Sequence, residues 1–97
     1  MASVEVKKTF EGKSASDLYD AGLKALPKAG FAIWKERQLA YLVMSKRMEN
    51  GSQIDCNYMA HMGSPVGVSV TLGCDSLTED DLRLWADKVF AAVQEVL

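Results

Sequence analysis

The chain between residues 50 and 74 reads NGSQIDCNYMAHMGSPVGVSVTLGC. Apolar and polar residues alternate from residue 52 to residue 62 and again from residue 66 to residue 74. A period of two is typical of β-strands that bury one face. Asn50-Gly51 favours a type I′ turn, because both central residues of that turn need a positive φ. The stretch therefore predicts two antiparallel strands that follow a tight hairpin turn.

Two amphipathic helices flank the predicted strands. Ser14 and Asp17 have the spacing of a capping box, as do Thr78 and Asp81, with Asp in place of the usual Glu. The second helix carries one apolar stripe, made of Leu82, Trp85, Val89, Ala92, Val93 and Val96. Pro27 lies inside the first helix, where it removes a backbone donor, so we expect that helix to kink or end near Leu26.

Three more strands complete the expected order. Residues 4–10 predict a first strand, and residues 31–35 and 39–48 predict two strands before the Asn-Gly turn. The order is β-α-β-β-β-β-α, and the short turns require antiparallel pairing. The sequence therefore predicts one α+β domain over residues 1–97, a two-layer sandwich with both helices on one face of the sheet.

This element order resembles the repeat unit of the TATA-box-binding-protein-like folds. Residues 23–31, LKALPKAGF, followed downstream by Asn50-Gly51, also look like a group of small uncharacterised bacterial domains. The resemblance implies a curved antiparallel sheet with both helices on its convex side, and it carries no catalytic residues. DNA binding is not implied, because the saddle of that family needs a tandem repeat, intercalating aromatic residues and positive charge.

Composition excludes several classes of function. The net charge of −2 is opposite to the basic surface that nucleic-acid binding usually requires. No stretch approaches the ~20 consecutive apolar residues of a membrane span. Two lysines, Lys7 and Lys8, precede any apolar run, so we expect no signal peptide and a cytoplasmic protein.

Metal and cofactor chemistry lack a sufficient set of ligands. Cys56 and Cys74 can share the inner face of the sheet, whereas His61 is an odd number of positions from Cys56 and points to the other face. Two thiols are too few for a structural zinc site, which takes about four ligands. We expect no metal and no cofactor.

Nucleophilic catalysis would depend on His61, the one histidine of the chain. Ser69 and Thr71 have the parity to lie on the same face, so a contact between serine and histidine is conceivable. Asp55 shares that face but is about 20 Å away at strand rise, too far to orient His61. We therefore expect no enzyme, and a hydrolase using His61 is the weakest of three hypotheses.

Two of the predicted strands are apolar on both faces. Residues 31–34 read FAIW and residues 39–44 read LAYLVM, although a sheet covered on one side needs only one apolar face. A two-residue turn at Asn50-Gly51 places Leu42 and Met44 outward, whereas a one-residue bulge places Tyr41 outward instead. The candidate binding residues are Trp34, Tyr41, Leu42, Met44, Met59 and His61.

The excess of apolar groups favours binding over catalysis. The first hypothesis is a binding or assembly module that forms a homodimer, or holds a protein partner, through the outer face of the sheet. The alternative is a carrier of a small apolar ligand in a pocket between the C-terminal helix and the sheet. The alternative predicts an internal cavity of roughly 300 Å³ or more.

Overall fold

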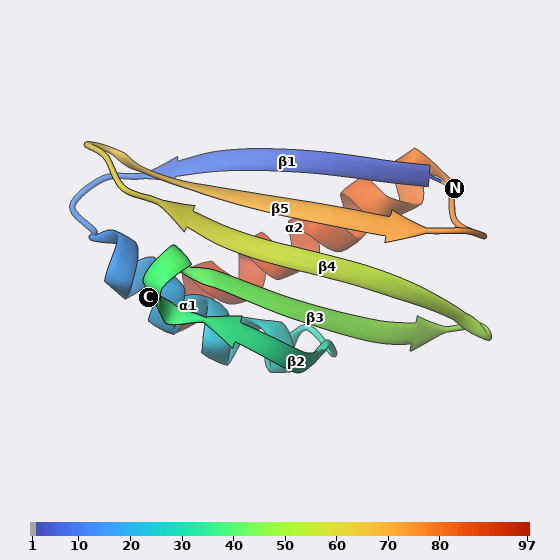
Figure 1. Ribbon diagram of the computed structural model, residues 1–97. Helices are drawn as coiled ribbons and strands as arrows, with labels where there is room; N and C mark the ends of the chain where they lie inside the picture. Colours follow the sequence, from blue (N-terminus) through green and yellow to red (C-terminus); the bar gives the residue numbers. More distant parts are fainter. Residues whose placement is uncertain (1) are drawn as a thin grey trace.

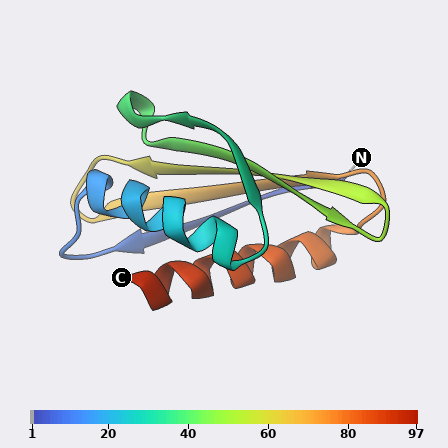
Figure 2. The same cartoon turned by 90° about the horizontal axis from the view of Figure 1, so that it is seen from below.

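Five antiparallel strands form one sheet in the computed structural model, which describes residues 2–97 (Figure 1). The elements are β1 (Ala2–Phe10), α1 (Ala15–Lys28), β2 (Ala32–Arg37), the 3-10 turn η1 (Gln38–Ala40), β3 (Leu42–Glu49), β4 (Ser52–His61), β5 (Val66–Cys74) and α2 (Glu79–Val96). Their order across the sheet is β1-β5-β4-β3-β2. Both helices lie on the same face of the sheet (Figure 2). The predicted α+β class and element order are confirmed.

The hairpin between β3 and β4 has the register of a two-residue turn. Asn50 and Gly51 have φ angles of 51° and 81°, as a type I′ turn requires. Glu49 pairs with Ser52, so every later partner on the two strands follows from the turn. The alternative register with a bulge at this turn is therefore wrong.

Both predicted capping boxes are present. The Ser14 hydroxyl accepts a hydrogen bond from the Asp17 backbone at 3.0 Å, and the Ser14 backbone donates to the Asp17 carboxylate at 3.0 Å. This backbone hydrogen bond from Ser14 lowers the pKa of Asp17. Thr78 and Asp81 make the same reciprocal pair at the start of α2. The caps fix where each helix begins.

The helix α1 runs past Pro27 and ends at Lys28, so the expected end near Leu26 is two residues too early. Backbone hydrogen bonds close this end, including one from Phe31 to the Leu26 carbonyl at 2.9 Å. Gly30 takes the left-handed conformation, with a φ of 92°. Pro27 is so close to the C-terminal end of α1 that little of the helix remains for it to disrupt.

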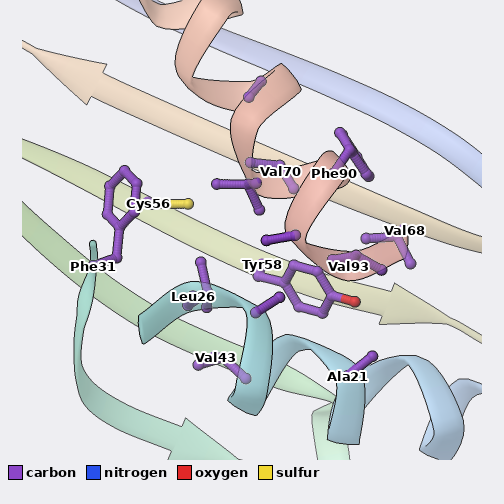
Figure 3. Packing of buried hydrophobic residues seen from close by; sticks show 14 of the residues in the cluster. Ala21, Leu26, Phe31, Val43, Cys56, Tyr58, Val68, Val70, Phe90 and Val93 are labelled. Carbon is purple, nitrogen blue, oxygen red and sulfur yellow. The ribbon is translucent and has the colours of Figure 1, made fainter. Parts of the chain in front are cut away.

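The core lies between the helices and the inner face of the sheet, and Tyr58 is at its centre (Figure 3). The Tyr58 hydroxyl donates a hydrogen bond to the Leu18 carbonyl of α1 at 2.6 Å. Gly22 lets α1 approach the tyrosine ring, because a Cβ there would be 2.7 Å from Cδ1. Burial raises the pKa of Tyr58, so its hydroxyl stays protonated and keeps donating.

The segment between β2 and β3 differs from the prediction of two regular strands. Gln38 to Ala40 form a 3-10 turn, and Tyr41 follows in the left-handed region with a φ of 52°. The register of β2 also shifts between Ile33 and Lys35. The expected strand over residues 39–48 is therefore three residues too long at its start. Figure 2 shows this end of the hairpin curling away from the helices.

Candidate functional site

The outer face of the sheet carries three of the six predicted site residues side by side. Leu42 is the direct cross-strand partner of Met59, and Met44 is two residues further along β3. All three side chains are half-buried although no helix covers this face. Trp34 lies in the irregularity of β2 and is 54% exposed. We call the apolar residues of β3 and β4 on this face the outer strip: Leu42, Met44, Met48 and Met59, where the exposed Lys46 separates Met44 from Met48.

Tyr41 does not join the outer strip. Its ring contacts Tyr19 of α1 edge-to-face, with ring centroids 6.3 Å apart, and it packs against the core. The left-handed backbone at Tyr41 ends the 3-10 turn and redirects the chain into β3. Tyr41 therefore lies on the helix side of the sheet, as the register of the two-residue turn predicts, and its role in binding stays a prediction.

His61 makes the expected contact with serine. Its Nε2 atom is 2.9 Å from the Ser69 hydroxyl, across β4 and β5 on the outer face. Within residues 2–97, the hydrogen bonds and ion pairs include none between His61 and a carboxylate. A histidine–serine pair without a third group to orient it lacks one part of a catalytic triad.

The two cysteines lie on the inner face, both buried and reduced. The Ser45 hydroxyl donates to the Cys56 carbonyl at 2.9 Å. Burial raises the pKa of Cys56 to about 12, which makes it a poor nucleophile and metal ligand. Burial also acts to raise the pKa of Cys74, but hydrogen bonds from Ser76 and the Leu77 backbone outweigh it, so that pKa is lowered. No group of three or more metal-ligating side chains occurs among the described residues.

An open groove lies where α2 passes the end of the β3–β4 hairpin. Its volume is about 690 Å³. Its apolar lining comes from Leu77, Leu84 and Trp85, and Glu49 and Asn50 of the hairpin form the opposite wall. Leu84 is 61% exposed. We call this the apolar groove.

A second hollow of about 430 Å³ adjoins the apolar groove and is lined by charged side chains. Trp85 stands between them: the Arg47 guanidinium lies 4.6 Å and the Lys88 ammonium 4.1 Å from its ring centre. The edge-to-face contact with Phe31, at 5.8 Å, holds the same ring from the core side. Lys28 and Glu95, an ion pair at 2.8 Å, line the far wall. We call this the cationic hollow.

The alternative hypothesis places a ligand between α2 and the sheet. Fully buried side chains pack there, among them Val70 and Tyr58 from the sheet and Val93 from α2 (Figure 3). The apolar groove and the cationic hollow lie at the surface, beside α2. The sequence does not predict the groove, because Trp85 belongs to the apolar stripe that the pattern of the second helix assigns to the core. Leu84, which falls off that stripe, was the signal.

Comparison with known proteins identifies the fold and no family. No family model matches the sequence, and no curated protein matches it either. The crystal structure of Ara h 8.0201 is similar with a TM-score of 0.50 and 11% identity, over 98% of this chain and 96% of that chain. The Zhui aromatase/cyclase from Streptomyces sp. R1128 has a TM-score of 0.43 and 11% identity, over 96% and 87%. Identity this low shows a likeness of fold alone.

Ara h 8.0201 is not a TATA-box-binding protein, so this comparison supports the small α+β architecture and not the expected resemblance to that family. Within residues 2–97, neither helix has the length and apolar content needed to span a membrane.

Proposed function

We propose that the protein binds a small apolar molecule in the apolar groove. The observation that supports this is the exposed Leu84 beside Trp85, in an open groove of about 690 Å³. Ligand pockets commonly have volumes of about 300–1,000 Å³ and a mostly apolar lining with a few polar groups. The proposal keeps the position expected for a carrier, between the C-terminal helix and the sheet, but moves the ligand from the interior to the surface.

The side chains around the groove are suited to holding a ligand without rearrangement. Trp85 is held by Phe31 on one side and by two cations over its ring, so its orientation is set before binding. A preorganised aromatic surface loses little side-chain entropy when it takes up a ligand. The proposal requires no catalysis and no cofactor, and the net charge of −2 supports no role with nucleic acid.

Tryptophan fluorescence tests the proposal. The chain has two tryptophans, so Trp34→Phe leaves Trp85 as the one reporter. Titration with 1-octanol should give a saturable change in Trp85 emission. Leu84→Ser should weaken binding severalfold, because it removes apolar surface from the groove.

Leu39→Ser is the matched control. Leu39 is fully exposed in η1 and does not line the groove, so its loss should leave octanol binding unchanged. A linear, non-saturating emission change, or equal weakening by Leu39→Ser and Leu84→Ser, would contradict the proposal.

A second candidate function is homodimerisation through the outer strip. The specific observation is that Leu42, Met44 and Met59 adjoin one another on a face that no helix covers, and that the exposed Met48 of β3 shares this face. Symmetric dimers are the commonest way for a chain to cover such a face. Methionine side chains also adapt to varied partner surfaces, so a protein partner is the other occupant for this face.

Sedimentation at micromolar concentration tests the second candidate. The native chain should sediment as a dimer, and Met44→Asp should make it a monomer. Thr71→Asp is the control, because Thr71 is on the outer side of β5 and outside the outer strip. A monomer at every concentration removes this candidate and leaves the first untouched.

A further inference from the structure

We propose that the ligand of the apolar groove carries a carboxylate at one end, which pairs with Arg47 and Lys88 in the cationic hollow. This inference rests on the proposed function and names the class of molecule: a small amphiphilic acid with an apolar body. The apolar body lies against Leu84 and one edge of Trp85, and the acid group lies beyond the tryptophan.

The two hollows share part of their lining. Trp85, Lys88 and Ala91 line both of them, so a single molecule that lies along Trp85 can contact each. We call the two hollows together the channel, which is apolar at one end and charged at the other.

Arg47 is the residue that indicates an anionic ligand. Its guanidinium has five N–H donors. Nη1 donates to the Gly30 carbonyl at 3.3 Å and Nη2 to the Glu49 carboxylate at 3.5 Å, both long contacts. Nε is buried and makes no hydrogen bond. An arginine that is half-buried with weakly used donors keeps the capacity to bind a carboxylate.

The charges around the channel orient such a ligand. Asp81 and Asp87 line the apolar groove and not the cationic hollow, so they repel an acid group from the first end. At the second end Arg47, Lys88 and Lys28 outnumber Glu95, which is already paired with Lys28. Glu49 takes up part of the Arg47 charge through its contact with Nη2. The net positive charge left there favours an anion.

Octanoate and 1-octanol form the test pair, because they share the same eight-carbon body and differ in charge. In the Trp34→Phe protein, octanoate should bind about tenfold more tightly than octanol, which corresponds to about 1.4 kcal/mol. Lys88→Gln and Arg47→Gln should each weaken octanoate binding severalfold more than they weaken octanol binding, because both ligands use Trp85 and only octanoate uses the two cations. Lys88 is exposed, so its replacement keeps the test valid if the Arg47 variant does not fold.

Lys46→Gln is the control, since Lys46 is exposed on the outer face and away from the channel. If octanol binds and octanoate binds no more tightly, the inference is overturned while the proposed function stands. If neither binds, the proposed function fails and the inference falls with it. Equal weakening by Lys46→Gln and Lys88→Gln would show a response to overall charge, which also overturns the inference.

Discussion

The strands β4 and β5 and the strands β2 and β3 form two halves of one sheet that use their residues differently. In β4 and β5, every even-numbered residue from Ile54 to Ala60 and from Val66 to Cys74 is buried, and the odd ones carry mostly polar groups. In β2 and β3, apolar side chains lie on both faces, and a register shift and a 3-10 turn interrupt the pair.

Burial under the helices accounts for the apolar residues on the covered face of the sheet. It does not account for those of the outer strip. One face of β4 and β5 packs under both helices, and the alternation follows from that cover. The outer strip has no equivalent cover within residues 2–97, yet it keeps Leu42, Met44 and Met59. Side chains that internal packing does not require are the ones available for contact with another molecule.

The largest expected effect comes from a matched pair of leucines, one in each half. Leu72 of β5 is fully buried, and Leu72→Ala should lower the free energy of unfolding by about 3 kcal/mol. Leu42 of β3 is half-buried on the outer face, so Leu42→Ala should cost less than about 1 kcal/mol. Urea unfolding measures both. A cost for Leu42→Ala that equals the Leu72 value would break the comparison.

A matched pair of glycines sharpens the contrast between the faces. A methyl group at Gly22 would overlap the Tyr58 ring, so Gly22→Ala should destabilise by about 2 kcal/mol. A methyl group at Gly67, on the outer face, would contact only the His61 Cβ atom at 3.9 Å. Gly67→Ala should leave the melting temperature unchanged or slightly higher. A large loss at Gly67 would show that the outer face is packed against something.

Alkaline pH should destabilise the protein through the inner face. The pKa of Cys56 is about 12 in the folded chain and 9.0 ordinarily, so the unfolded chain loses the proton first as pH rises. The contribution of the protonated Cys56 thiol to the free energy of unfolding is fully present below pH 9. Above pH 9 it should fall by about 1.4 kcal/mol per pH unit. Cys56→Ala should remove that part of the slope in urea unfolding between pH 8 and 11. An unchanged slope would place the thiol in contact with water.

The smallest expected effect is at the turn that sets the register. Asn50 has a φ of 51°, which costs most residues about 1 kcal/mol relative to asparagine or glycine. Asn50→Ala should therefore lower the free energy of unfolding by about that amount, and Asn50→Gly should not. Thermal unfolding of both variants gives the measurement. Equal losses would mean that the asparagine side chain matters more than its backbone.

Much of the fold could be predicted from the sequence, because the deciding signals are local. Asn50-Gly51 specified the register through its backbone preference, and Thr78 with Asp81 marked the start of α2 through their spacing. The interruption before β3 was missed, because Tyr41 is a good strand residue and the local sequence predicts neither its left-handed backbone nor its contact with Tyr19. That contact joins residues far apart in the chain.

The candidate site was predictable only in part. Leu42, Met44 and Met59 followed from parity once the turn was assigned. The apolar groove and the cationic hollow were not foreseen, since they depend on how α2 crosses the hairpin and brings Trp85 next to Arg47. No sequence pattern in α2 or in β3 predicts that contact. Leu84 was the residue whose position the helical stripe did not explain.

The free edges of the sheet carry charges at the positions where another strand would have to dock. At one edge, β2 exposes Lys35, Glu36 and Arg37 in sequence, and at the other β1 exposes Lys7 and Lys8. Charged side chains along an edge strand oppose the addition of further strands from neighbouring chains. These charges therefore disfavour the growth of continuous sheets by edge-to-edge stacking of copies.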